Sequence, residues 1–302
     1  MENPQVSIII PTYNRPHLLP RAIDSALGQT VEDLEVVVVD DGSEPPVKLV
    51  DHPRLRLIRL PHNQGTAVAR NRGAEAAQGR WIAYLDDDDQ LLANMVEISL
   101  TALAETQLPP PVAVLSGLEV VTPEGKVLET RIPPTLARGS HFFLEALEVG
   151  KSFLSKQTLF VERQLLLQLG GYDETFQSRV HTEMFLRLNP VCSILGLPQV
   201  TYRLTAHSGP RVSRDPNLRQ VSFHRLIEKH QSIFQSHPEA FAQFIFQHAK
   251  TSYGLGQRKA ALLNLIRAVQ VYPPYVAGAL FYDFKEFILR VWKHNERRQF
   301  SQ

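Results

Sequence analysis

The chain has 302 residues, of which 43% are hydrophobic and 21% charged, and its formal net charge is +1 at pH 7. These values indicate a globular protein and argue against a disordered chain or a nucleic-acid-binding one. The single cysteine, Cys192, excludes an intramolecular disulfide and is compatible with a reducing cytoplasm. The N-terminus has no basic region before an apolar stretch, and no apolar run reaches about 18 residues, so we expect neither a signal peptide nor a transmembrane helix.

Residues 1–85 predict alternating strands and helices. Aliphatic runs predict strands at 6–10, 34–39, 55–60 and 81–85, and helical spacing or an Ala-rich composition predicts helices at 18–27 and 66–77. That order indicates a doubly wound, mostly parallel sheet. Ligands bind such sheets at the carboxyl ends of the strands, where three polar clusters of this chain fall, at 11–15, 40–43 and 86–89.

The remaining chain is less regular and then becomes helical. Strands are expected at 112–121, at 157–161 and, as an edge strand, at 200–204, with helices at 162–169 and 179–188. Further helices are expected at 217–236, 238–252, 257–271 and 275–294. Residues 241–273 resemble one helix-turn-helix unit of the tetratricopeptide type. One unit is too short for a solenoid, so we expect a helical appendage that packs on the main domain.

The polar clusters before residue 86 each have a functional and a structural interpretation. Thr12, Tyr13 and Arg15 could hold a planar base and a phosphate, or they could form a turn that starts a helix. Asp41 could accept a hydrogen bond from a base or ribose, although Asp, Gly and Ser are also common turn formers. Arg70, near a helix start that offers N–H groups to an anion, could reach a diphosphate or could lie on a solvated face.

Four consecutive carboxylates, Asp86 to Asp89, follow the strand predicted at 81–85. Like charges in a row repel one another, and hard cations such as Mg²⁺ and Mn²⁺ take carboxylate oxygens as ligands. Asp86 and Asp88 are two residues apart, so in an extended segment their side chains would point to one side and could meet the same metal–diphosphate assembly. The alternative for an isolated acidic run is a solvated turn.

Together these clusters resemble the family 2 glycosyltransferases with the GT-A fold. The matching segments lie in the family's order and spacing within residues 5–205, and they read SIIIPTYNRP, ALGQT, VVVVDDGS, NQGTAVARNRG, GRWIAYLDDDD and GGYDETF. The resemblance implies a nucleotide-sugar donor with UDP favoured, a divalent cation (Mn²⁺ or Mg²⁺) and, usually, inversion at the anomeric carbon.

The resemblance also implies roles for single residues. Thr12 and Tyr13 should touch the nucleobase, whose N–H Asp41 should accept. Asp86 should bind ribose or the sugar, and Asp88 should be the principal metal ligand. Arg203 or His207 could contact the diphosphate, although His207 could also be an ordinary loop residue. The expected donor site comprises Pro11, Thr12, Tyr13, Arg15, Asp40, Asp41, Arg70, Asp86, Asp87 and Arg203, and the expected metal site comprises Asp88 and His207.

The chain departs from the family pattern at the expected general base. A Glu-Asp pair normally follows the GGYDE-type segment, and its Asp deprotonates the acceptor hydroxyl. Here the alignment of Phe185-Leu186-Arg187 with the family's aromatic-Leu-Arg places Val180 and His181 at those positions. Imidazole has a pKa suited to proton abstraction near neutral pH, so His181 could be the base. Glu183 could serve if the helix is shifted, or the chain could have lost transferase activity.

These observations predict an α/β protein of GT-A type, a Rossmann-like, mostly parallel sheet flanked by helices with a C-terminal α-helical appendage. We expect a glycosyltransferase domain at 1–215, with a nucleotide-binding half at 1–110 and an acceptor-binding half at 111–215, and a helical region at 216–302. The expected function is metal-dependent transfer of a sugar from a nucleotide sugar to a hydroxyl of a saccharide, lipid-linked or protein acceptor. The alternative is a catalytically impaired nucleotide-sugar-binding protein that acts through its helical tail.

The expected location is the cytoplasm or the inner face of a membrane. Residues 276–292 mix aromatic and aliphatic side chains, and Arg290, Lys293, Arg297 and Arg298 lie in or after this stretch. A basic, aromatic helix can lie on an anionic bilayer, which would make the protein a peripheral membrane partner. The alternative is a packing helix with a solvated basic end.

Overall fold

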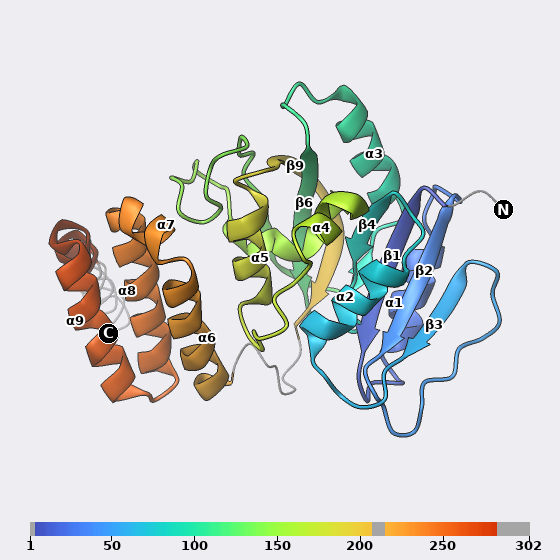
Figure 1. Cartoon of the computed structure of the whole chain (residues 1–302), viewed down its shortest axis with the longest axis horizontal. Coiled ribbons are helices and arrows are strands. Elements are labelled where there is room, and N and C mark those ends of the chain that lie inside the picture. Colours follow the sequence, from blue (N-terminus) through green and yellow to red (C-terminus); the bar gives the residue numbers. More distant parts are fainter. Residues whose placement is uncertain (1–3, 207–214, 283–302) are drawn as a thin grey trace, which may run out of the picture. The chain divides into compact units, whose positions relative to one another are not determined.

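The computed structural model describes residues 4–206 and 215–282 of the chain. The chain divides into two compact units, Met1–Phe223 and His224–Gln302. The first unit contains the sheet and the helices that flank it, and the second is built of helices (Figure 1). This architecture confirms the α/β fold with C-terminal helices that the sequence predicts.

Nine strands among the described residues form one sheet with the order β3-β2-β1-β4-β8-β6-β9-β5, and β7 pairs with β6. The pairs β1–β2, β2–β3, β1–β4 and β6–β9 are parallel, and the pairs that involve β5, β7 or β8 are antiparallel. The strands are β1 (Val6–Thr12), β2 (Leu34–Asp40), β3 (Leu55–Arg59), β4 (Trp81–Tyr84), β5 (Gln90–Leu91), β6 (Val112–Val121), β7 (Val127–Arg131), β8 (Phe160–Glu162) and β9 (Ser193–Thr205).

Helices cover both faces of the parallel part of the sheet, which explains why β1 and β2 are buried throughout and largely aliphatic. Val6, Ile8 and Ile10 of β1 share a core cluster with the buried side of α1. Ile9 points to the other face, where it meets Gly73 of α2. The first unit contains α1 (Leu19–Leu27), α2 (Thr66–Ala76), α3 (Met95–Glu105), a 3₁₀ helix (Phe153–Thr158), α4 (Arg163–Gln168) and α5 (Val180–Leu188).

The contact of α2 with the sheet depends on Gly73. A Cβ at this position would collide with Cγ2 of Ile9 and approach Cγ2 of Val39 to 3.2 Å. Helix propensity alone favours Ala over Gly by about 1 kcal/mol, but overpacking a core typically costs about 1–3 kcal/mol. We therefore expect Gly73→Ala to lower the free energy of unfolding, measured by urea denaturation. A Cβ on Gly278 has no described heavy atom within 4 Å, so Gly278→Ala should be neutral or stabilising.

The second unit begins within α6 and consists of short helices. They are α6 (Pro216–Lys229), α7 (Gln231–Ser236), α8 (Pro238–Gly254) and α9 (Arg258–Val271), and residues 273–282 are also helical. The single helix expected at 217–236 is interrupted at His230, which leaves the helical conformation with φ −113° and ψ 30°. Within residues 4–206 and 215–282, no helix is long and apolar enough to cross a bilayer.

Two strands of the first unit differ from their sequence-based expectation. The expected edge strand at 200–204 is the end of the longer β9, which lies between β6 and β5. The first two residues of the expected strand at 157–161 end the 3₁₀ helix, and β8 begins only at Phe160. Neither α3 nor β5 was predicted from the sequence. The basic residues expected in the tail helix, at 290–298, lie outside the described residues.

Candidate functional site

The three polar clusters lie at neighbouring strand ends. Because β1, β2 and β4 are parallel and β1 pairs with both others, their carboxyl ends meet at one edge of the sheet. Residues 11–15, 40–43 and 86–89 occupy that edge. The register pairs Thr12 directly with Asp40, and Leu85 donates a backbone hydrogen bond to Ile9. The topology therefore brings together segments that are far apart in the sequence. Thr12 and Asp87, for example, are hydrogen-bonded although 75 residues separate them.

The four carboxylates of the acidic run have two different environments. Asp87 is buried and accepts hydrogen bonds from Oγ1 of Thr12 at 2.7 Å and from Arg15 at 3.0 Å. Asp89 is buried and accepts from the Tyr202 hydroxyl and from the Thr205 backbone N–H, both at 2.8 Å. These two side chains tie the run to β1 and β9.

Asp86 and Asp88 are the members of the run that keep solvent contact. Their side chains are 35% and 14% exposed, respectively. Arg15 contacts Asp88 at 2.9 Å, and Arg21 donates to the Asp88 backbone carbonyl at 2.8 Å. The run has two accessible carboxylates, but it is a turn and not the extended segment expected, since the Asp89 N–H donates to the Asp86 carbonyl at 3.1 Å.

Like charges crowd this end of the sheet. Burial and, after it, the charges of Asp86 and Asp88 raise the pKa of Asp89 well above its usual range. Burial also raises the pKa of Asp87, although the Thr12 hydrogen bond and the Arg15 charge oppose that rise. A cation at the edge of the run would reduce this repulsion.

Arg70 is the main counter-charge to Asp86. Its side chain is buried and donates to Oδ1 of Asp86 at 2.6 Å, and its guanidinium lies 5.6 Å from the centre of the Tyr172 ring. Burial alone would raise the pKa of Asp86, but the charge of Arg70 and weaker contributions from other cations hold that pKa below its usual value. Nε of Arg70 has no hydrogen-bond partner among the described residues, so one buried donor stays available.

His181 lies in the first turn of α5, beside this ion pair. The Tyr172 hydroxyl is 3.3 Å from Nδ1 of His181, and the two rings meet edge-on with their centres 5.4 Å apart. Burial and then the charge of Arg70 lower the pKa of His181 to about 3, against the opposing effect of Asp86. The imidazole is therefore neutral at physiological pH and can accept a proton, although the lowered pKa makes it a weaker base.

Glu183 has a different environment from His181. It is fully buried, and both of its carboxylate oxygens accept hydrogen bonds from Arg187, at 2.8 and 2.7 Å. Arg187 also donates to the backbone carbonyls of Leu169 and Gly171, at 2.6 and 2.7 Å. The pair therefore joins α5 to the turn after α4, and no face of the carboxylate is open to an acceptor.

Asp40 and Asp41 hold the loops at the edge of the site. The buried Asp40 carboxylate accepts from the Ser43 N–H and from Arg59, both at 2.8 Å. Asp41 accepts from the backbone N–H groups of Gln64 and Gly65, also at 2.8 Å, which positions the loop before α2. Burial raises the pKa of Asp41 despite these two hydrogen bonds.

Two expected donor-site residues of the first cluster differ in accessibility. Pro11 is buried within β1, whereas the Tyr13 side chain is 43% exposed and can offer a ring face to a ligand. The Thr12 hydroxyl, in contrast, already donates to Asp87. This arrangement makes Tyr13 the accessible member of the cluster.

Arg203 is not brought to the acidic run, and His207 lies outside the described residues. The Arg203 side chain is exposed and forms an ion pair with Glu119 at 3.5 Å. Its strand neighbour Tyr202 instead reaches Asp89, because successive side chains of a strand diverge. Tyr172, Tyr202 and Arg21 were not among the expected site residues, although Tyr172 stands within a segment that carries the family resemblance.

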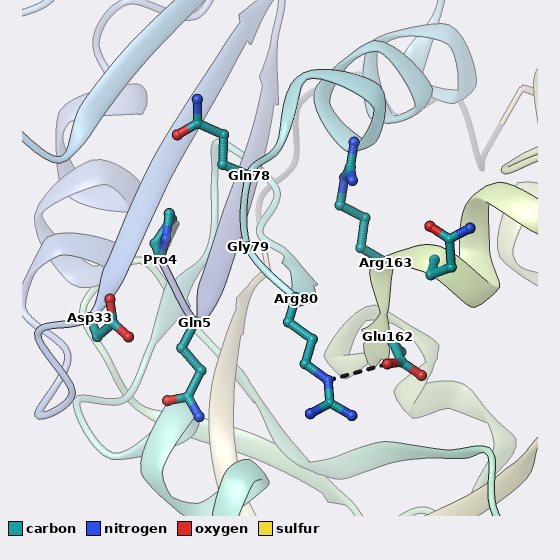
Figure 2. A pocket seen from close by; sticks show the side chains of 9 residues that line it. Pro4, Gln5, Asp33, Gln78, Gly79, Arg80, Glu162 and Arg163 are labelled. Carbon is teal, nitrogen blue, oxygen red and sulfur yellow. Dashed lines mark hydrogen bonds and ion pairs between the residues drawn. The ribbon is translucent and has the colours of Figure 1, made fainter. Parts of the chain in front are cut away.

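A surface pocket of about 510 Å³ lies away from this site (Figure 2). It is lined by residues that precede β1, β2 and β4, such as Gln5, Asp33 and Arg80, and by Glu162 to Gln164. Arg80 and Glu162 form an ion pair across it at 3.2 Å. The pocket therefore lies at the amino ends of the parallel strands and contains none of the expected site residues.

Comparisons with known proteins place this site in a family. Residues 7–110 match the family model described as Glycosyl transferase family 2. The succinoglycan biosynthesis protein ExoO of Rhizobium meliloti is 38% identical over 165 residues, which cover 52% of this chain and 44% of that protein. The UDP-Glc:alpha-D-GlcNAc-diphosphoundecaprenol beta-1,3-glucosyltransferase WfgD of Escherichia coli is 34% identical over 112 residues, which cover 36% of this chain and 44% of that protein.

The fold has solved counterparts. A crystal structure of S. aureus TarS 1–349 in complex with UDP-GlcNAc superposes with a TM-score of 0.61 at 18% identity, covering 90% of this chain and 82% of that one. This likeness shows a shared GT-A-type fold. The chain spans less than half the length of the two curated relatives. From the family model and the relatives together, residues 7–110 of this chain form a domain of glycosyl transferase family 2.

Proposed function

We propose that this protein transfers a sugar from a UDP-sugar to a hydroxyl of a saccharide acceptor, with inversion at the anomeric carbon. The observation that carries the proposal is the pair of accessible carboxylates, Asp86 and Asp88, beside the buried Arg70 at the carboxyl ends of β1, β2 and β4. A divalent cation and a diphosphate need this combination of accessible oxygen ligands and a fixed positive charge. TarS, which shares the fold, was crystallised with UDP-GlcNAc, and that supports UDP as the nucleotide.

The donor would lie along this edge of the sheet. The exposed Tyr13 ring is suited to stack on the uracil. The Asp41 oxygens each keep a lone pair that the N–H groups of Gln64 and Gly65 do not use, so Asp41 is suited to accept the uracil N–H. Arg70 would face the diphosphate with its unpartnered Nε. Asp86 would bind ribose or sugar hydroxyls, while Thr12, Asp87 and Arg15 would keep the acidic run in place.

The residues present fit a divalent cation. Asp86 and Asp88 offer partly exposed oxygen ligands, and they stand in a run of four consecutive carboxylates whose mutual repulsion a cation would reduce. We assign Asp88 as the principal ligand, with Asp86 close by. A bound Mn²⁺ or Mg²⁺ would supply Lewis-acid stabilisation of the departing nucleoside diphosphate.

His181 is the proposed base. It is neutral at physiological pH, it lies beside Asp86 and Arg70, and Tyr172 orients its ring. In a single displacement the acceptor oxygen would bond to the anomeric carbon while the diphosphate oxygen leaves, and His181 would take the hydroxyl proton. The paired and buried state of Glu183 favours His181 over it.

The proposed acceptor is a lipid-linked saccharide. The name of WfgD states a diphosphoundecaprenol-linked acceptor, and ExoO is named for polysaccharide biosynthesis.

The experiment that tests the function is a donor panel. The full chain is incubated with Mn²⁺ and UDP-, GDP- or dTDP-sugars, and released nucleoside diphosphate is measured with and without diphosphoundecaprenol-linked saccharides. We expect release only from a UDP-sugar, and faster release with an acceptor. Tight UDP-sugar binding without any turnover would instead support the alternative function, a nucleotide-sugar-binding protein. A histidine at the position of the expected base is the reason for considering that alternative.

A further inference from the structure

One face of α9 exposes large aliphatic side chains. Leu262, Leu263, Ile266 and Val269 are each between 41% and 58% exposed. The opposite side of the helix, with Ala261, Asn264 and Ala268, is buried within the second unit. Single exposed leucines are ordinary on a protein surface, but four on adjacent turns of one helix form a continuous apolar strip.

The same face is positively charged. Arg258 and Lys259 are exposed and lie one turn before Leu262 and Leu263, at the i, i+4 spacing that places side chains on one side of a helix. Residues 251–282 contain these two cations and Arg267 but no Asp or Glu. We call the set Arg258, Lys259, Leu262, Leu263, Ile266 and Val269 the α9 face.

We infer that the α9 face docks the protein on the surface of an anionic lipid bilayer. Aliphatic side chains would enter the boundary between headgroups and acyl chains, while the two cations at its amino-terminal end meet anionic headgroups. α9 (Arg258–Val271) itself contains no Asp or Glu, so no carboxylate on the helix repels such a surface. A soluble protein partner would not require a segment free of acidic residues, so the charge pattern favours the bilayer.

This surface is independent of the donor site, although it would serve the proposed lipid-linked acceptor. An apolar, basic helix face would hold the enzyme where that acceptor is concentrated, without a membrane-spanning segment. The two proposals can therefore fail separately, because bilayer docking and release of UDP are measured in different assays.

The test is sedimentation of the full chain with vesicles. Vesicles of phosphatidylcholine alone are compared with vesicles that also contain phosphatidylglycerol, at low and high salt. We expect binding to the anionic vesicles that weakens as salt rises, since exposed charges are screened. The triple change Leu262→Ser, Leu263→Ser and Ile266→Ser, and separately Arg258→Glu with Lys259→Glu, should each reduce binding at least tenfold.

The matched control is Val127→Ser with Leu128→Ser on β7, which alters two exposed aliphatic residues of the first unit. This control should bind vesicles like the unchanged chain. Absence of vesicle binding by the unchanged chain, or equal binding by both α9 variants, would overturn the inference. A large fall in melting temperature of the triple variant would also overturn it, because it would show that the α9 face is covered within the chain. Dimerisation of the unchanged chain that the triple variant abolishes would overturn it as well. Release of UDP from a UDP-sugar in the absence of lipid should be the same in all forms.

Discussion

Replacing Asp88 with Asn is expected to abolish metal-dependent binding of UDP. The side chain keeps its size but loses the charge that a hard cation requires. A change at a group that merely hydrogen-bonds to a metal ligand typically costs about 10- to 100-fold in metal affinity, so loss of the principal ligand should cost more. Isothermal titration with UDP, with and without Mn²⁺, measures the effect without any need for turnover.

The Asp88→Asn variant should still be folded. Asp88 adds to the repulsion that raises the pKa of Asp89, and Arg15 keeps Asp87 as a partner when Asp88 is neutral. We therefore expect no fall in melting temperature in the absence of metal. Asp33→Asn, at the amino end of β2, is the matched control because it removes an exposed carboxylate at the other end of the sheet. Metal-dependent binding of UDP that is unchanged in Asp88→Asn would remove Asp88 from the metal site.

Replacing His181 with Ala is expected to reduce turnover by about 10²- to 10⁴-fold, the usual contribution of a general base, with little change in donor affinity. His181→Asp is the complementary test of this position, because it introduces the residue that the family resemblance leads us to expect there. It should recover much of the turnover that Ala loses. Thr182→Ala, the next residue of α5, should be close to unchanged.

Glu183→Gln separates a base from a structural residue. Because Glu183 is fully buried and paired with Arg187, its neutral substitute should lower the melting temperature, while His181→Ala should not. If Glu183→Gln were stable and inactive while His181→Ala stayed active, Glu183 would be the base. Turnover and thermal unfolding measured on the same preparations decide between the two.

The lowered pKa of His181 makes a further prediction about pH dependence. A base with a pKa of about 3 in the free enzyme is already unprotonated across the neutral range. The value of kcat/KM for the donor reports free-enzyme groups, so it should not fall through titration of His181 between about pH 7 and 5, where an ordinary imidazole with a pKa of about 6.5 would become protonated. A fall in kcat/KM centred near pH 6.5 that disappears in His181→Asp would show that the pKa of His181 is not lowered.

The parallel core of the first unit was predictable because its signals are local. The runs that form β1, β2 and β4 are largely aliphatic, and they end in polar residues that are common in turns. Parallel topology then requires these ends to share one edge. The elements that were missed or misplaced, such as α3, β5 and the start of β8, are short or depend on pairing partners far along the chain.

The sequence by itself therefore predicted the resemblance to family 2 glycosyltransferases, the edge of the sheet at which we expect the donor, and the residue types gathered there. Only the tertiary structure distinguished among those residues. It separated the accessible Asp86 and Asp88 from the buried Asp87 and Asp89, and it paired Glu183 with Arg187 while it left His181 beside Asp86. The physical reason is that a residue's chemistry is encoded locally, whereas its solvent exposure and hydrogen-bond partners come from elements such as β9 and α5 that lie about 100 residues away in the chain.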